Sequence, residues 1–214
     1  DMAWNINAID YTNVENHLVN WAAREFGNEN AKRIADIMNE YYRLASVRRP
    51  EHMGFNRVEI SGYPRGGLMP VMAPEFTEDE ARKRLEDYEK IEKAATELAA
   101  SISPDRVDAY YQLVEYPVRA ASQMNKKLLL TGQPALNAYN EIVRLTNRYN
   151  KEIANGKWNL IMDMKPRRLP VFESPVYTHI DAKLCRSNPK SKYVIKGSEF
   201  IKQTGTNRII KGLG

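Results

Sequence analysis

Residues 77–102, TEDEARKRLEDYEKIEKAATELAASI, carry the clearest structural pattern of the chain. This stretch opens with a capping box, in which the side chains of Thr77 and Glu80 each accept a hydrogen bond from the other residue's backbone N–H. Apolar side chains then recur every three or four residues, at Leu85, Tyr88, Ile91, Ala95, Leu98 and Ile102. This spacing places them on one face of a helix, and the opposite face is charged. The stretch therefore predicts a long amphipathic helix.

Two helices are predicted before this stretch. The first spans about residues 12–26, where Thr12 and Glu15 form a second capping box. The second has Asn28 or Asn30 as its N-cap, because short polar side chains accept from the free N–H groups of a first turn. Its apolar stripe is Ile34, Ile37, Met38, Tyr41 and Leu44. The short connection between the two helices predicts a helical hairpin.

A fourth helix is predicted directly after residues 77–102. Ser103 and Pro104 suit the N-cap and the first position of a helix that runs towards Leu130. Pro117 falls inside this helix and has no N–H to donate. It therefore predicts either a bend or a break beside Tyr116.

The last predicted helix begins at Pro134 and is ended by Asn155 and Gly156, a pair that suits a left-handed C-cap. Trp158 follows directly, and we expect it to fold back on this helix. The helical stripes together predict an all-α fold. It is a bundle of about five helices with an irregular, β-leaning C-terminal extension.

Charge and proline content divide the chain further. We expect residues 1–11 to be a linker or the end of a preceding domain, residues 12–156 to be the bundle, and residues 157–214 to be an extension or the start of a β-sandwich. The extension holds twelve Lys and Arg against four Asp and Glu, whereas the whole chain has a net charge of +5. Few aromatic residues accompany these basic ones, which argues against a nucleic-acid interface. Residues 51–76, rich in Gly and Pro, predict a long irregular connection.

Composition excludes several classes of protein and site. With 43% hydrophobic and 28% charged residues among 214, the sequence is typical of a soluble globular chain without a membrane span. The single cysteine, Cys185, excludes an internal disulfide and a Cys-based zinc site. The three histidines, His17, His52 and His179, are scattered, and neither a metal nor a cofactor is predicted. No complete active site is visible in the sequence.

Four motifs occur in an order that carries a resemblance. They are D-M-A-W-N at residues 1–5, W-A-A-R-E-F-G at 21–27, L-V-E-Y-P-V at 113–118 and Y-N-K-E-I-A-N-G-K-W at 149–158. Together they resemble the helical domain that follows the catalytic barrel in glycoside hydrolase family 115, the xylan α-1,2-glucuronidases. The resemblance covers about residues 1–163.

The resemblance implies an accessory domain of an enzyme that releases (4-O-methyl-)glucuronic acid from glucuronoxylan with inversion. The barrel with its acid and base would precede Asp1, so no catalytic residue is assigned here and the isolated chain is expected to be inactive. If residues 1–5 end a barrel strand, Trp4 and Asn5 would lie where barrels bind substrates, which makes them the candidate substrate-binding residues. The structural motif residues are Trp21, Tyr116, Pro117, Gly156 and Trp158.

The implied partners are glucuronoxylan or aldouronic acids, bound through the preceding domain, and a homodimer is left open. A secreted or periplasmic location is implied as well, although the chain begins at Asp1 without a signal segment. A second hypothesis is a free-standing helical adaptor whose basic tail binds an acidic protein or a nucleic acid. The coding sequence upstream of Asp1 would separate the two hypotheses.

Overall fold

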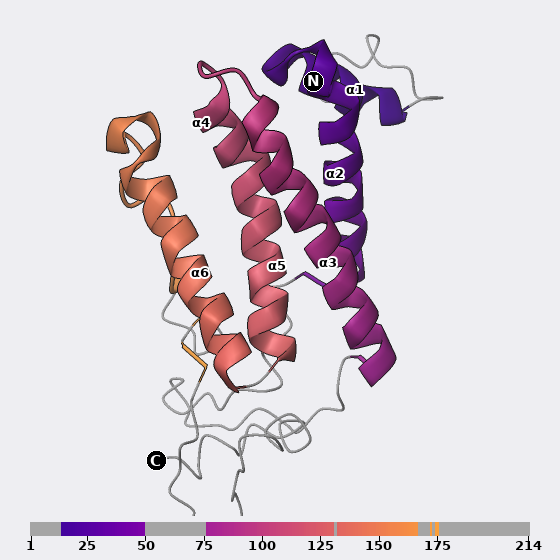
Figure 1. The fold of residues 1–214 in the computed structure, drawn as a ribbon, viewed down its shortest axis with the longest axis vertical. Helices are drawn as coiled ribbons and strands as arrows, with labels where there is room; N and C mark the ends of the chain where they lie inside the picture. Colours follow the sequence, from indigo (N-terminus) through magenta and orange to yellow (C-terminus); the bar gives the residue numbers. More distant parts are fainter. Residues whose placement is uncertain (1–13, 50–75, 131, 167–171, 173, 176–214) are drawn as a thin grey trace, which may run out of the picture.

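The computed structural model describes residues 14–49, 76–130, 132–166, 172 and 174–175. Within these ranges the regular structure is helical and contains no strand. The helices lie side by side as rods, and α4 (Val107–Tyr110) and α5 (Tyr116–Leu129) belong to the same rod (Figure 1). The predicted all-α bundle of about five helices is therefore confirmed. No helix in the described ranges is both long enough and apolar enough to cross a membrane.

Helices α1 (Val14–Phe26) and α2 (Asn28–Val47) form the first hairpin, with Gly27 as the single linking residue. Gly27 has φ of 95°, a backbone conformation that glycine adopts without steric cost. The prediction of an asparagine N-cap is wrong, because Gly27 itself occupies the N-cap position and no side chain caps the helix. Asn30 is instead buried, and its Nδ2 donates to the carbonyl of Ser101 at 3.1 Å. It thereby links α2 to the far end of α3.

Helix α3 (Glu78–Leu98) is the predicted long helix, and its capping box is confirmed. The backbone N–H of Glu80 donates to Thr77 Oγ1 at 3.2 Å, and the N–H of Thr77 donates to Glu80 Oε2 at 2.8 Å. A short 3₁₀ turn, Ala99–Ser101, continues the helix. The local sequence pattern alone was sufficient to locate this helix, because both bonds of the box join residues three apart.

The next rod comprises α4 (Val107–Tyr110), a π-helical turn (Tyr111–Glu115) and α5 (Tyr116–Leu129). Its predicted start at Ser103 is wrong. Ser103 and the proline after it lie in a turn, closed by a 2.9 Å hydrogen bond from the N–H of Arg106 to the Ser103 carbonyl. The helix therefore begins only after this turn.

Helix α6 (Gly132–Lys151) begins two residues before the predicted Pro134. A 3₁₀ segment, Ile153–Gly156, follows it. Asn155 and Gly156 have φ of 55° and 76°, so the pair is left-handed as predicted. The prediction that this pair ends the helix is wrong, because α6 already ends at Lys151. A Cβ on Gly156 would lie 3.1 Å from the Lys151 carbonyl oxygen, so the site requires glycine for space as well as for φ.

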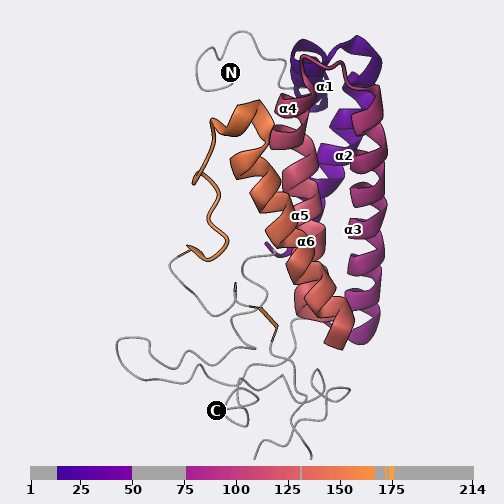
Figure 2. The ribbon, with the colours of Figure 1, turned by 60° about the vertical axis from the view of Figure 1, so that its left-hand side comes forward.

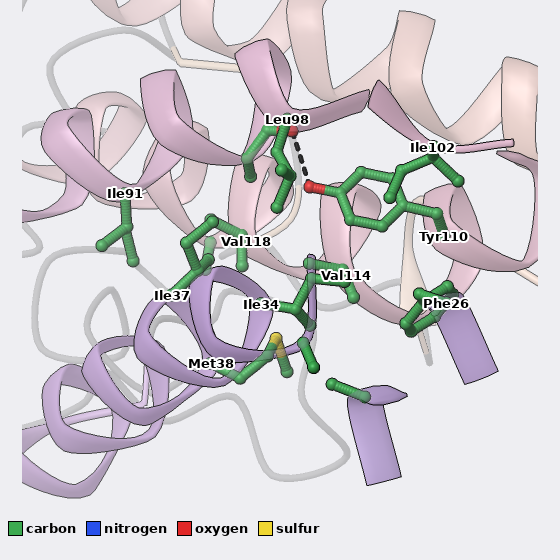
Figure 3. Close-up of a cluster of buried hydrophobic side chains, with 14 of the residues drawn as sticks. Phe26, Ile34, Ile37, Met38, Ile91, Leu98, Ile102, Tyr110, Val114 and Val118 are labelled. Atoms are coloured by element: carbon green, nitrogen blue, oxygen red, sulfur yellow. Dashed lines mark hydrogen bonds between the residues drawn. The ribbon is translucent and has the colours of Figure 1, made fainter. Parts of the chain in front are cut away.

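Helix α5 is central, because it packs against both α3 and α6, while α1 packs on α2 (Figures 1 and 2). The main core lies among α1, α2, α3 and the α4–α5 rod and is drawn in Figure 3. Its labelled members are Phe26, Ile34, Ile37, Met38, Ile91, Leu98, Ile102, Tyr110, Val114 and Val118. Tyr110 fills this core and donates its hydroxyl to the Ala95 carbonyl at 2.7 Å. Burial of such side chains contributes about 1.5–3 kcal/mol each.

Several predictions fall outside the described residues. They include the capping box at Thr12, the connection at residues 51–76 and most of the β-leaning runs of the extension. The three-part division of the chain, with its boundaries after residues 11 and 156, stays a prediction.

Candidate functional site

The π-helical turn Tyr111–Glu115 stands directly before Pro117. Because Pro117 has no N–H, the Leu113 carbonyl has no α-helical donor. The N–H of Tyr116 reaches back to the Tyr111 carbonyl, five residues earlier, and forms a π-type hydrogen bond. The predicted bend or break therefore takes the form of a π turn within a continuous rod. Glu115, the last residue of this turn, is buried at 3% exposure.

A network of charged side chains joins α5 to α6 around Glu115. Arg119 donates from Nη1 to Glu115 Oε1 at 2.6 Å and from Nη2 to Glu141 Oε1 at 2.7 Å. Arg144 makes two further 2.7 Å bonds to Glu141, and Arg148 Nη1 lies 4.0 Å from Glu115 Oε1. Two carboxylates thus share three guanidinium groups. This arrangement fixes the register of α5 against α6.

The charge network does not suit acid catalysis. The hydrogen bond from Arg144 and the charges of Arg144 and Arg119 hold the pKa of Glu141 below its usual value. A glycosidase acid needs the opposite shift, because it must keep its proton near neutral pH. Within the described helices the shifted carboxyl pKa values all move downward, at Glu40, Glu80, Asp105 and Glu141.

Tyrosines fill the rest of the α5–α6 contact. Tyr111 donates its hydroxyl to the Leu145 carbonyl at 2.8 Å, and Tyr116 shares a 3.1 Å hydrogen bond with Thr146 Oγ1. The rings of Tyr116 and Tyr149 lie 5.0 Å apart between centroids. Burial raises the pKa of both Tyr111 and Tyr116, so neither is an acid–base group at neutral pH. These tyrosines are packing residues with satisfied hydroxyls.

Raised tyrosine pKa values predict a loss of stability in alkali. Burial raises the pKa of Tyr110, Tyr111 and Tyr116 above the value of about 10 for an unfolded chain. Their contribution is fully present below that pH and is lost as the pH rises towards the folded values. In a spectroscopic titration we expect part of the phenolate absorbance to appear together with the loss of helical circular dichroism. Tyr111→Phe should reduce that step, and full ionisation with helix retained would contradict the expectation.

The region around residues 149–162, at and after the end of α6, is held by side-chain contacts. Asn150 donates from Nδ2 to the Met162 carbonyl at 2.8 Å and accepts from the Met162 N–H at 2.9 Å. Trp158 packs against a small cluster that contains Leu145 and Ile153, and it is half-buried. As expected, Trp158 lies back on the last helix, although it is not fully enclosed. These contacts fix a segment that has little regular structure of its own.

The other candidate residues fall into two groups. Trp4 and Asn5 lie outside the described residues. Trp21 packs on the main core, with its ring edge-on to Phe26 at 5.6 Å between centroids. Tyr116, Pro117 and Gly156 lie in the α5–α6 and post-α6 contacts described above. In the described part of the chain, no three His, Cys, Asp or Glu side chains gather as metal ligands would.

Sequence reasoning missed the buried charged residues Glu115, Arg84 and Lys127. Glu115 stands next to core residue Val114, and Arg84 lies on the same helical face as Tyr88. Arg84 donates from Nε to Asn125 Oδ1 at 2.7 Å and from Nη1 to the Leu44 carbonyl at 3.0 Å. A charged residue at an apolar position of a helical stripe was the available signal, because a buried charge must be paired.

Comparison with known proteins gives a family-model match and matches to solved structures. A family model described as "Glycosyl hydrolase family 115" matches residues 1–52. One similar solved structure is described as a novel family 115 4-O-methyl-α-glucuronidase with specificity for decorated arabinogalactans. It is 39% identical in sequence with a TM-score of 0.71, over 83% of this chain and 24% of that chain. A search of curated proteins gave no match.

The two matches agree with the order of motifs along the chain. The family match includes the D-M-A-W-N and W-A-A-R-E-F-G motifs, and the structural match extends over most of the chain. Residues 1–52 thus match the family 115 model, and most of the chain is similar in sequence and fold to about a quarter of the length of a solved family 115 structure.

Proposed function

We propose that this chain is the helical accessory domain of an α-glucuronidase whose catalytic barrel lies outside it. The observation that carries the proposal is the 39% identity to a 4-O-methyl-α-glucuronidase, together with a TM-score of 0.71 over most of the chain. The domain's role is to brace the catalytic domain, because its own polar groups are engaged in helix–helix contacts. The alternative, an adaptor with a basic tail, stays a hypothesis, because most of that tail lies outside the described residues.

The proposed reaction is hydrolysis with inversion. It needs a carboxylic acid and a carboxylate about 6.5–9.5 Å apart, so that a water attacks opposite the leaving sugar. Glu115 and Glu141 are both bound to Arg119, and the pKa of Glu141 is held below its usual value, opposite to the shift that a proton donor needs. This supports an acid and a base supplied by the barrel and a chain that carries no catalytic residue.

The proposed substrate is a glycan that bears terminal (4-O-methyl-)glucuronic acid in α linkage. The motifs imply glucuronoxylan and aldouronic acids, whereas the solved relative is described as specific for decorated arabinogalactans. The activity that the motifs imply and the activity named for the solved relative both act on 4-O-methyl-glucuronic acid in α linkage. Recognition of the uronic acid is therefore the feature that we propose the two enzymes share, and the polymer that carries it is the feature in which they differ.

The full-length polypeptide, assayed on both polymers, tests this proposal. We expect release of (4-O-methyl-)glucuronic acid from glucuronoxylan, from glucuronic-acid-decorated arabinogalactan, or from both. The relative rates identify the preferred polymer. Absence of release from either polymer and from aldouronic acids would contradict the proposal.

Trp4 and Asn5 remain the proposed substrate contacts. An indole face and an amide suit the apolar face and the hydroxyls of a sugar. In the full-length polypeptide we expect Trp4→Ala and Asn5→Ala to lower kcat/KM by more than tenfold, which corresponds to about 1.4 kcal/mol. A change within about twofold would mean that both residues are structural and do not contact the substrate.

We also propose a secreted or periplasmic location, as for related glycoside hydrolases.

A further inference from the structure

The segment after α6 forms a short projection, residues 157–162, which we call the tip. Two backbone turns shape it, with the N–H of Asn159 donating to the Gly156 carbonyl and the N–H of Ile161 to the Trp158 carbonyl, each at 3.1 Å. No helix or strand of its own stabilises the tip. Its conformation therefore depends on contacts with the helices.

Contacts at both ends of the tip hold it in place. Before it, the N–H of Ala154 donates to Asp108 Oδ2 on α4 at 2.7 Å. At its other end, the Asn150 side chain holds both the N–H and the carbonyl of Met162. Within it, Trp158 packs on the cluster beside α6. The tip is thus clamped to two different helices.

The tip exposes two large apolar side chains at a conformational cost. Leu160 is 85% exposed and Ile161 is 60% exposed. Leu160 also has φ of 67°, and Ala154 has φ of 48°, a region that costs non-glycine residues about 1–3 kcal/mol. The exposed Val47 differs, because it lies on a regular helix and requires no strain. Strain and clamps that present apolar groups to solvent are typical of a binding surface.

We propose that Leu160 and Ile161 dock on the domain that precedes the bundle in the same polypeptide; this inference rests on the proposed function. The C-terminal end of α6 and the start of α1 lie at the same end of the bundle (Figures 1 and 2). A domain joined before α1 would therefore lie near the end of the bundle that carries the tip. The solved relative is about four times as long as the stretch matched here, so most of such a polypeptide lies outside the bundle.

Hydrogen exchange of the tip amides tests the docking. The comparison uses the full-length polypeptide, the 214-residue chain, and the double variant Leu160→Lys/Ile161→Lys in both. We expect the amides of Asn159 and Ile161 to exchange at least about tenfold more slowly in the full-length protein. The double variant should abolish that protection and leave the melting temperature of the 214-residue chain unchanged, because both side chains are exposed there.

Val47→Lys is the matched control. Val47 is 62% exposed and lies at the last residue of α2, at the opposite end of the bundle. Val47→Lys should leave the slow hydrogen exchange of the tip amides in the full-length protein unchanged. Equal exchange in the two proteins, or protection that survives the double variant, would overturn the docking. Protection that rises with protein concentration would assign the tip to a second copy instead. Release of glucuronic acid, measured on the same samples, reports separately on the proposed function.

Discussion

Replacing Glu115 with alanine is expected to lower the free energy of unfolding by about 3–5 kcal/mol, as for the loss of one partner from a buried ion pair. The carboxylate is 3% exposed and accepts from Arg119 at 2.6 Å. Its removal leaves Arg119 with Glu141 alone and deprives Arg148 of its nearest counter-charge in the network. Denaturant unfolding, followed by circular dichroism, measures the change.

An exposed ion pair on the same bundle provides the control. Glu89 is 70% exposed and lies 3.9 Å from Lys126, so Glu89→Ala should cost less than about 1 kcal/mol. Glu115→Gln keeps an acceptor without the charge and should fall between the two. A loss below about 1 kcal/mol for Glu115→Ala would mean that the network does not hold α5 against α6.

Arg84→Ala should have an effect of similar size, a loss of about 3 kcal/mol or more. The guanidinium of Arg84 donates to Asn125 and to the carbonyls of Leu44 and Arg48 at the C-terminal end of α2. Those carbonyls form the negative end of the helix dipole, and alanine would leave these three acceptors without the Arg84 donors. The ring of Tyr88, 5.0 Å from the guanidinium carbon, would lose a cation–π contact as well.

Two variants show whether the Arg84 effect comes from its geometry. Arg84→Lys retains the charge but not the planar fork, and it should recover only part of the loss. Arg82→Ala removes an arginine from the same helix that is 69% exposed, and it should change stability by no more than about 0.5 kcal/mol. Equal stability of the Arg84→Ala and Arg82→Ala variants in denaturant would contradict the assigned contacts.

Local signals in the sequence were sufficient to predict much of the bundle. The Thr77–Glu80 box and the Asn155–Gly156 pair act over a few residues, and the structure contains both. Apolar periodicity located the helices because each buries one face. The predicted start of the fourth helix at Ser103 was wrong for a related reason. The Ser103 carbonyl accepts a local hydrogen bond, from the N–H of Arg106, in a turn that precedes the helix.

The features that sequence reasoning missed depend on distant partners. Asn30 is a good capping residue by type, but its partner is Ser101, which is 71 positions away. Glu115 has a local partner in Arg119, but Arg148 on α6 also faces it, and Arg84 meets carbonyls at the end of α2. The partners on α6 and α2 are not visible in a local pattern. For the site, the sequence named Trp4 and Asn5, and both remain to be tested in a protein that contains the barrel.

The most direct measurement of the central claim compares the 214-residue chain with the full-length polypeptide on aldouronic acids. We expect the full-length protein to release (4-O-methyl-)glucuronic acid. The isolated chain, shown by circular dichroism to be folded, should release none above background. The reason is that the isolated chain lacks the acid and the base. Release by the isolated chain at a rate typical of enzymes, about 1 per second or faster, would contradict the account.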